Sequence, residues 1–133
     1  MHITLESDYA IRIVACLARS HKRMDAKAIS ESTNVTLRFA LKILRKLVAS
    51  GIVKSFKGTQ GGYEIDKAPV DITLCDVIET VEGPYYFSRC LGDTYSCSIE
   101  HSTSACCAFQ EAFNDITATV RGMMKSYTFD KLI

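Results

Sequence analysis

The sequence predicts a mainly helical fold that carries one small two-stranded β-hairpin and a long helix near its C-terminal end. Three observations support this fold class. Apolar residues recur at helical spacing through much of the chain, two short β-prone segments flank a glycine-rich turn, and an apolar stripe keeps a heptad-like repeat late in the sequence. With 133 residues and 47% hydrophobic content, the chain suffices for one domain, or a small domain plus an appendage, with a substantial core.

The first helix is expected over residues 7–20, because Ser7 or Asp8 can cap it and apolar residues follow at helical spacing. Its expected inward-facing residues are Ala10, Val14 and Leu17. Cys16 lies within this pattern and is expected to be a small core residue, since unpaired cysteines are so often buried.

A second and a third helix follow closely. The second is expected over residues 26–33, with Asp25 as its N-cap and Asn34 in the left-handed turn after it. Thr36 can cap a third helix that runs to Ser50. The expected inward-facing residues of this third helix are Leu37, Leu41, Leu44 and Val48.

The third helix carries its charge on a separate face. At 100° per residue, Arg38, Lys42 and Arg45 fall within about 60° of one another. Between Glu31 and Glu64 the chain holds six basic residues and no acidic one, although its net charge is only +1. A basic excess this local is typical of a surface that faces an anionic polymer.

Two β segments come next, over residues 52–56 and 63–65. The turn between them reads Lys57-Gly58-Thr59-Gln60-Gly61-Gly62, and its glycines permit the positive φ angles of a hairpin tip. Helix, short turn, helix and basic hairpin together predict a winged helix-turn-helix. In that geometry the third helix enters a major groove of DNA, and the hairpin lies along the backbone or in the adjacent minor groove.

The sequence therefore predicts a set of DNA contacts. Four cations are expected to contact mainly phosphate: Lys42, Arg45, Lys46 and Lys54. Near the start of the third helix, the residues expected to reach base edges are Thr36, Arg38 and Phe39. At the hairpin, the expected contacts are Lys57, Thr59 and Gln60. The alternatives are a solvated helix face, or a winged helix used only for protein contacts.

The rest of the chain is acidic. Residues 1–70 hold 12 Lys and Arg against 6 Asp and Glu, whereas residues 71–133 hold 4 against 9, so the two parts are expected to have different partners. We expect a DNA-binding domain over residues 1–70, a short helix and cysteine-rich loop over 71–104, and a dimerisation helix with a tail over 105–133. Within the middle part, Thr73 can cap a fourth helix. Its expected buried residues are Val77, Ile78 and Val81, and Cys75 is also expected in the core.

The long helix is expected over residues 105–126. Its apolar stripe recurs at steps of 4, 3, 4, 3 and 4 through Phe109, Phe113, Ile116, Val120, Met123 and Tyr127. Such a heptad seam predicts packing against a second copy of the helix, and hence a homodimer. The alternative is a single amphipathic helix packed on its own domain.

Six cysteines occur without a secretory signal, which favours thiols, metal ligands or redox groups over a disulfide framework. The N-terminal apolar run is short and interrupted by arginines, so we expect no membrane span and a cytoplasmic location. Cys90, Cys97 and Cys106 follow a C-x6-C-x8-C spacing, which suits a soft metal centre such as an iron–sulfur cluster. A structural zinc site with Cys107 or His101, or a thiol switch, is also open.

An enzyme is the least favoured class, because the sequence contains no phosphate loop and no paired-carboxylate motif. Neither does spacing identify any Cys and His as nucleophile and base.

Nearly the whole chain resembles the Rrf2 family of bacterial transcription regulators, which includes proteins of the IscR, NsrR, RirA and CymR types. The resemblance rests on residues 7–12 (Ser-Asp-Tyr-Ala-Ile-Arg), the helix-turn-helix, residues 57–63 (Lys-Gly-Thr-Gln-Gly-Gly-Tyr), and the cysteine-bearing loop before a long helix. It implies a homodimer that binds a partly palindromic double-stranded operator through two winged helices. Several members begin the wing motif with Arg, where this chain has Lys57.

The resemblance also implies an iron–sulfur cluster at Cys90, Cys97 and Cys106. A four-iron four-sulfur cluster, which we favour over a two-iron two-sulfur cluster, needs a fourth ligand. Asp8 matches the position from which NsrR-like members supply an aspartate across the dimer, with helix capping as its alternative role. IscR-like members use a histidine three residues after the third cysteine, where this chain has Phe109. His101, Glu100 and Cys107 are the substitutes for Asp8.

Overall fold

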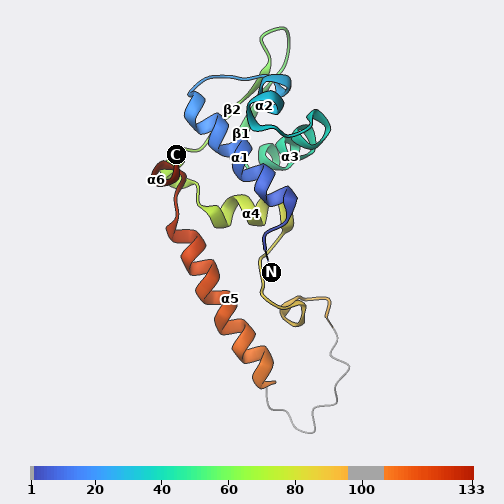
Figure 1. Cartoon of the computed structure of the whole chain (residues 1–133), viewed down its shortest axis with the longest axis vertical. Coiled ribbons are helices and arrows are strands. Elements are labelled where there is room, and N and C mark those ends of the chain that lie inside the picture. The colour runs from blue at the N-terminus through green and yellow to red at the C-terminus, as the bar shows by residue number, and fades with distance from the viewer. Residues whose placement is uncertain (1, 96–106) are drawn as a thin grey trace.

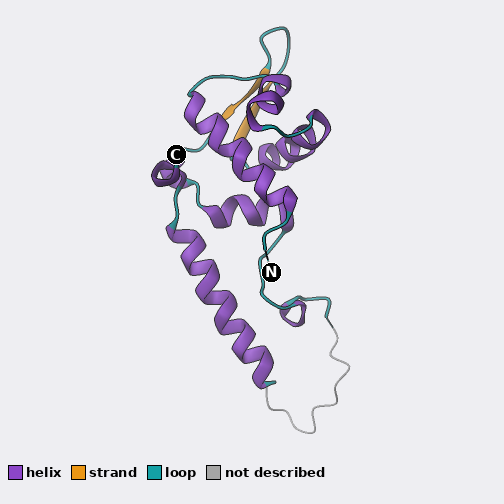
Figure 2. Ribbon diagram, viewed as in Figure 1, coloured by secondary structure: helices purple, strands orange, loops and turns teal. Residues whose placement is uncertain are grey.

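The computed structural model describes residues 2–95 and 107–133. Three helices and a β-hairpin gather at one end of the molecule, and one long helix extends away from them (Figures 1 and 2). The first group comprises α1 (Leu5–Ser20), α2 (Ala26–Thr33), α3 (Leu37–Ala49), β1 (Val53–Phe56) and β2 (Gly62–Ile65). The remaining elements are the short turns η1 (Pro69–Asp71) and η2 (Arg89–Leu91), and the helices α4 (Leu74–Glu82), α5 (Ala108–Ser126) and α6 (Phe129–Leu132). The predicted fold class, a winged helix-turn-helix followed by a long helix, is confirmed. We call residues 5–65 the N-terminal unit.

Helix α1 begins earlier than the sequence predicted. Its N-cap is Thr4, whose Oγ1 accepts a hydrogen bond from the Ser7 backbone N–H at 3.2 Å. The predicted cap Ser7 is instead fully buried, and its hydroxyl donates to Glu82 of α4. The prediction of a cap at Ser7 or Asp8 was therefore wrong, because a threonine just upstream caps the helix and frees Ser7 for a contact between helices.

The caps predicted for α2 and α3 are confirmed. Asp25 accepts a hydrogen bond from the Ala28 N–H at 2.7 Å, and Asn34 ends α2 in the left-handed conformation with φ of 54°. The Thr36 hydroxyl oxygen accepts from the Phe39 N–H at 3.4 Å and begins α3. These side-chain contacts set the turn that positions the third helix.

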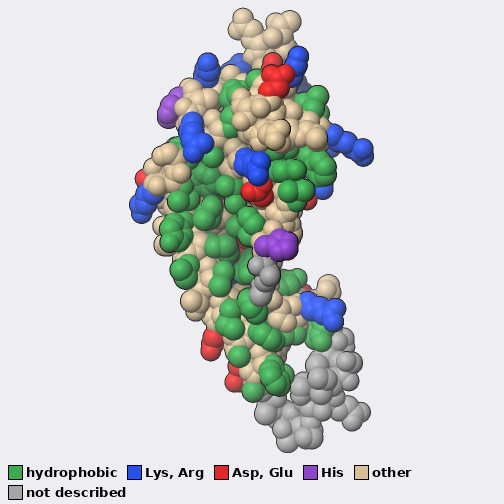
Figure 3. Space-filling view, in the orientation of Figure 1, with side chains coloured by type: hydrophobic (Ala, Val, Ile, Leu, Met, Phe, Trp, Pro, Cys, Tyr) green, Lys and Arg blue, Asp and Glu red, His purple; other side chains and the backbone are tan. Residues whose placement is uncertain are grey.

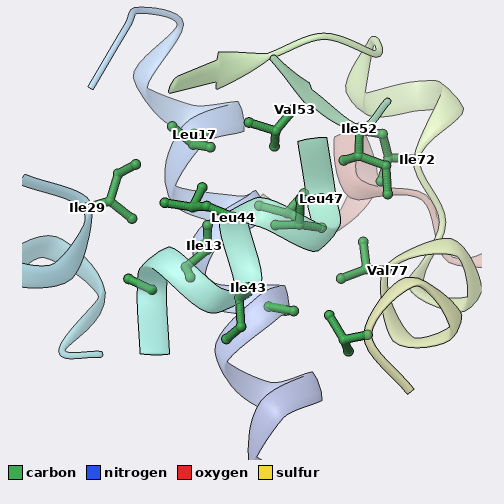
Figure 4. Packing of buried hydrophobic residues seen from close by; sticks show 14 of the residues in the cluster. Ile13, Leu17, Ile29, Ile43, Leu44, Leu47, Ile52, Val53, Ile72 and Val77 are labelled. Atoms are coloured by element: carbon green, nitrogen blue, oxygen red, sulfur yellow. The ribbon is translucent and has the colours of Figure 1, made fainter. Parts of the chain in front are cut away.

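The inward face of α3 differs from the predicted one. The helix buries Ala40, Ile43, Leu44 and Leu47, of which only Leu44 was expected. Leu37 is 46% exposed, and Leu41 and Val48 are only partly buried. The buried face is rotated by roughly a quarter-turn from the predicted stripe and shares Leu44 with it, because α1 and β1 pack against the side of α3 that carries Ile43 and Leu47. Figure 4 shows side chains of α1, α3 and β1 converging on this interior.

The hairpin forms a two-stranded antiparallel sheet with Val53 opposite Ile65 and Phe56 opposite Gly62. A bridge between Met24 and Tyr63 adds a short third partner from the α1–α2 connection, with hydrogen bonds of 2.9 and 2.7 Å. Gly62 has φ of 143°, and a Cβ there would lie 2.5 Å from the Met24 carbonyl oxygen. The turn end of the hairpin therefore needs glycine at this position for close backbone approach.

Helix α4 links the N-terminal unit to the long helix. Its capping box is complete, because Thr73 and Asp76 exchange hydrogen bonds in both directions. Val77, Ile78, Val81 and Cys75 are buried as predicted. Cys16, by contrast, is only partly buried on α1, with its Sγ 3.9 Å from the Met24 sulfur.

Helix α5 begins at Ala108, three residues later than predicted, and a short helix α6 that was not predicted follows it. Phe129 of α6 is 1% exposed and belongs to the core of the N-terminal unit. A bridge between Thr73 and Thr128 holds this segment beside the start of α4, with the Phe129 N–H donating to the Ile72 carbonyl at 2.9 Å. The C-terminal end of α5 is thus attached, through α6, to the core of the N-terminal unit.

Candidate nucleic-acid interface and cysteine segment

The exposed face of α3 carries the cations that the sequence placed there. Arg38, Lys42 and Arg45 line a shallow hollow of about 640 Å³ together with Phe39 and Leu41. The prediction that these three cations lie on one face of α3 is therefore confirmed. A role of these side chains in DNA contact stays a prediction.

Two of the predicted phosphate contacts are already paired within the protein. Lys42 Nζ lies 3.1 Å from Glu6 Oε2, and Lys46 Nζ lies 2.6 Å from Glu6 Oε1. Lys46 also donates to the Val81 carbonyl at 2.8 Å. The hydrogen bond from Lys46 is the largest influence on the Glu6 carboxyl, and together with Lys42 it outweighs burial and lowers the pKa of Glu6.

The hairpin shows the same division between paired and unpaired cations. Lys54 lies 3.3 Å from Glu64 and 3.7 Å from Asp66. Within the described ranges, Arg38, Arg45 and Lys57 take part in no ion pair. These three side chains are the cations on the predicted surface whose charge no carboxylate offsets at ion-pair distance.

The residues at the start of α3 have structural contacts of their own. Thr36 is exposed and uses its oxygen as the helix cap. Phe39 is 43% exposed and packs edge-on against Tyr9 of α1, with ring centroids 5.9 Å apart. Its ring is thus partly available, and α1 fixes its position.

Arg23 supports the hairpin, and sequence reasoning missed it. Its guanidinium lies 3.3 Å from the centroid of the Phe56 ring and donates to the Gln60 carbonyl at 3.0 Å. Thr59 and Gln60 themselves are exposed at the hairpin tip. The sequence shows only an arginine directly before Met24. Its partners, Phe56 and Gln60, come close to it only when the hairpin folds.

We call residues 90–107 the cysteine segment. Two of its predicted ligands, Cys97 and Cys106, lie outside the described residues. Cys90 is in η2, and its carbonyl accepts a hydrogen bond from the Gln110 side chain of α5 at 3.2 Å. Cys107 is the N-cap residue of α5. Both described ends of the segment therefore meet the first turn of the long helix.

Asp8, the predicted fourth ligand, lies in the first turns of α1. Its carboxylate pairs with Arg12 at 2.7 Å, and both side chains are well exposed. Across residues 2–95 and 107–133, no three His, Cys, Asp or Glu side chains come together as a metal site. The structure thus shows where Cys90 and Asp8 lie and does not bring them into one complete donor set.

The predicted seam of α5 is largely uncovered. Phe109 is 75% exposed, Met123 57% and Ile116 39%, while Phe113 stacks on Phe87 with centroids 5.7 Å apart. Figure 3 shows hydrophobic side chains along the part of the surface that α5 forms. The alternative that the stripe packs on its own domain holds for Phe113, but it does not describe the exposed Phe109, Ile116 and Met123.

The junction between α4 and α5 is polar. Arg121 of α5 binds Glu79 of α4 with two hydrogen bonds of 2.7 and 2.9 Å, and Glu79 also accepts from the Tyr85 N–H at 3.0 Å. Burial raises the pKa of Glu79, but these hydrogen bonds together outweigh it and leave that pKa below its ordinary value. One carboxylate thus joins α4, α5 and the chain that leads to the cysteine segment.

None of the helices among the described residues has both the length and the hydropathy needed to cross a bilayer.

Residues 3–133 match the Rrf2 family, described as "Iron-dependent Transcriptional regulator". The regulator NsrR of Bacillus licheniformis is 25% identical over 136 residues, which cover 100% of this chain and 92% of that protein. The structure of CymR, the global cysteine regulator of B. subtilis, is similar with a TM-score of 0.76 and 25% identity, and the match covers 99% of this chain and 95% of CymR. IscR of T. potens has the same fold, with a TM-score of 0.77, 19% identity, and coverage of 99% and 85%.

These relatives are transcription regulators, which confirms that the chain is not an enzyme. The chain belongs to the Rrf2 family of DNA-binding transcription regulators.

Proposed function

We propose that the protein is a cytoplasmic homodimeric regulator whose operator affinity is controlled by an iron–sulfur cluster bound at the cysteine segment. One observation carries this proposal: both described ends of that segment meet the first turn of α5, through Cys107 as N-cap and through the bond from Gln110 to the Cys90 carbonyl. A change in the cysteine segment therefore acts directly on the helix proposed to pair the two subunits. In this proposal, residues 1–70 bind DNA, residues 71–104 sense and residues 105–133 dimerise.

The exposed seam of α5 supports the dimer. Large apolar side chains at heptad spacing are unfavourable in water. Pairing two such helices buries this surface and stabilises the dimer by about 25 cal/mol per Å² of apolar surface buried. Two copies would then present two α3 helices to successive half-sites of one operator.

The donor types suit the cluster. Cys90, Cys97 and Cys106 would supply thiolates, and Asp8 of the partner subunit would supply a carboxylate. Asp8 is available for this role because its described partner is Arg12 in an exposed ion pair, which is worth only about 0–1 kcal/mol. When bound, the cluster would supply redox and ligand-exchange chemistry that responds to oxidants, nitric oxide or iron supply.

Such a cluster regulates only if it binds one dimer arrangement more tightly than another. Cys90 contacts the start of α5 through its backbone carbonyl, Cys107 is the N-cap residue of that helix, and Asp8 lies on α1 of the N-terminal unit. Joining these points across the dimer would fix the separation of the two α3 helices. Cluster-bound and cluster-free protein should then differ in operator affinity, and equal affinities would refute this mechanism while leaving DNA binding intact.

The decisive experiment is anaerobic purification followed by a visible spectrum and iron and sulfide analysis. We expect a coloured protein with matching iron and sulfide, loss of both in Cys97→Ala, and a labile cluster in Asp8→Ala. Colourless protein with stoichiometric zinc would overturn the assignment. The Glu31→Gln variant, on an exposed part of α2, is the control for handling losses.

The alternative function is a thiol switch without a cluster. Cys90 in η2 and Cys107 at the start of α5 favour it, because both are free and partly exposed. A metal-free protein whose DNA affinity changes with mild oxidation, and recovers with reductant, would favour this alternative over the cluster.

DNA binding itself is tested by salt titration. A dimer that neutralises about 8–10 phosphates should lose affinity with a slope near −0.9 per phosphate in a plot of log affinity against log salt concentration. Binding that barely changes with salt would count against the proposed interface.

A further inference from the structure

Glu6 stands between the two lysines of α3 that the sequence assigned to phosphate. Each carboxylate oxygen takes one ammonium, Oε2 from Lys42 at 3.1 Å and Oε1 from Lys46 at 2.6 Å. The Glu6 side chain is 23% exposed, so the pairs are less screened by water than ordinary surface ion pairs. A single carboxylate from α1 thus forms ion pairs with two of the four cations on α3.

The two lysines are held unequally. Lys46 has a second acceptor, the Val81 carbonyl in the last turn of α4, at 2.8 Å, and its side chain is 36% exposed. A cation is favoured at that helix end because unsatisfied carbonyls concentrate there. Lys42 has Glu6 as its described acceptor and is 53% exposed. Lys42 is therefore the ammonium that a competing anion can take, whereas Lys46 is fixed in place.

The position of Glu6 is itself fixed. On either side of it, the Thr4 and Ser7 hydroxyls both donate to Glu82 at the end of α4, the former at 2.6 Å. Ser7 is fully buried, so this attachment lies at the edge of the core. The first turn of α1 cannot shift to follow a lysine that moves away.

We infer that Glu6 is a positioning residue that enforces selectivity in DNA reading: it withholds Lys42 and Lys46 from phosphate until an operator phosphate reaches Lys42. This inference rests on the proposed use of α3 as the DNA-reading helix. Randomly placed duplex must compete with the carboxylate for Lys42, which weakens non-specific binding. A correctly seated operator brings a phosphate close enough to displace it.

The test is the salt dependence of binding to a non-operator duplex, measured by fluorescence anisotropy for the full chain. Glu6→Gln removes the charge and keeps the shape of the side chain. Freeing Lys42 should add about one phosphate contact per protomer, which steepens the slope by about 0.9 per protomer. Affinity for non-operator DNA should rise more than affinity for the operator, so the ratio between them falls.

Two further variants separate release of Lys42 from a general charge effect. Glu31→Gln on α2 removes an equal charge from an exposed residue that is in no described ion pair, and it should leave the slope nearly unchanged. Adding Lys42→Gln to Glu6→Gln should return the slope to its original value. A steeper slope that persists in this double variant would overturn the inference.

A second pair of variants keeps Glu6 in place and does not depend on the folding of Glu6→Gln. With Glu6 intact, Lys42→Gln should scarcely change non-operator binding, whereas Arg45→Gln, which lacks an ion pair in the described residues, should flatten the slope by about 0.9 per protomer. Equal effects of the two variants would refute the inference. If the unmodified protein shows no salt dependence, the DNA interface itself fails; a steep slope that Glu6→Gln leaves unchanged refutes only the role of Glu6.

Discussion

Arg23 is the residue whose importance is least visible in the sequence. It stacks on Phe56 and donates to the Gln60 carbonyl, so one side chain from the α1–α2 connection supports both the strand and the tip of the hairpin. Such an arginine acts by holding the hairpin in place.

We predict that Arg23→Ala weakens operator binding by at least about fivefold and by at most about 70-fold. The variant loses a cation–π contact of about 0.5–1 kcal/mol and a hydrogen bond of about 0.5–1.5 kcal/mol, both of which position the hairpin. Operator affinity measured by mobility shift checks this result. The neighbouring Lys22→Ala, an exposed cation without a described ion pair, is the control, and an equal loss in both variants would show that only charge matters.

Charge at the residue scale also shows a limit of sequence reasoning. The segment from Glu31 to Glu64 is correctly identified as basic, because it contains no acidic side chain between those residues. Folding then brings Glu6 to Lys42 and Lys46 across 36 and 40 positions, and brings Asp66 to Lys54. A count along the chain contains no information about such distant partners.

At the scale of elements, local chemistry predicted helix ends better than helix faces. Asp25, Asn34, Thr36 and Thr73 begin or end helices as expected, since capping depends on neighbours within four residues. The buried face of α3 was misjudged because Leu37 and Ile43 are equally apolar, and only packing against α1 and the hairpin selects between them. Helix α6 was missed because a four-residue helix has too few turns to show a period.

The junction between α4 and α5 yields a pH prediction. Because the pKa of Glu79 lies below its ordinary value of 4.5 in the folded protein, its contribution to stability is complete above about pH 4.5. It is lost as the pH falls through the folded pKa. Glu79→Gln should therefore lower the free energy of unfolding by about 1–3 kcal/mol at pH 7, since charge-assisted hydrogen bonds are lost.

Thermal unfolding of this variant and the unmodified protein between pH 7 and pH 3 checks the prediction. The difference between them should shrink steadily below pH 4.5. Glu31→Gln, which has no described ion pair and lies away from a helix N-terminus, should show no such convergence. A difference that stays constant with pH would mean that packing, and not the charge of Glu79, stabilises the junction.

At the scale of the whole molecule, the long helix projects from the N-terminal unit with its apolar seam in solvent (Figure 1). We predict that Phe109→Asp together with Met123→Asp converts a dimer to a monomer, because burying two carboxylates in a helix pair is strongly unfavourable. Sedimentation velocity measures the change. Operator affinity should fall with it, since each monomer reads only one half-site.

Ala118→Asp is the matched control for the seam. Residue 118 is exposed and lies nine positions from Phe109, which places it half a turn away on the helix. This variant should remain dimeric. A monomer in both cases would indicate loss of helix stability, and a dimer in both would place the subunit interface elsewhere.

The buried Phe129 fixes one end of α5 in the core, so α5 can act as a lever that pivots at this residue. Helix α5 has 19 residues and so measures about 28 Å, with Cys107 at one end and the buried Phe129 just beyond the other. If the end of α5 at Cys107 moves by about 2 Å, the helix rotates by about 4° around Phe129. Two such levers joined along their length would turn a local change in the cysteine segment into a change of angle between the two N-terminal units.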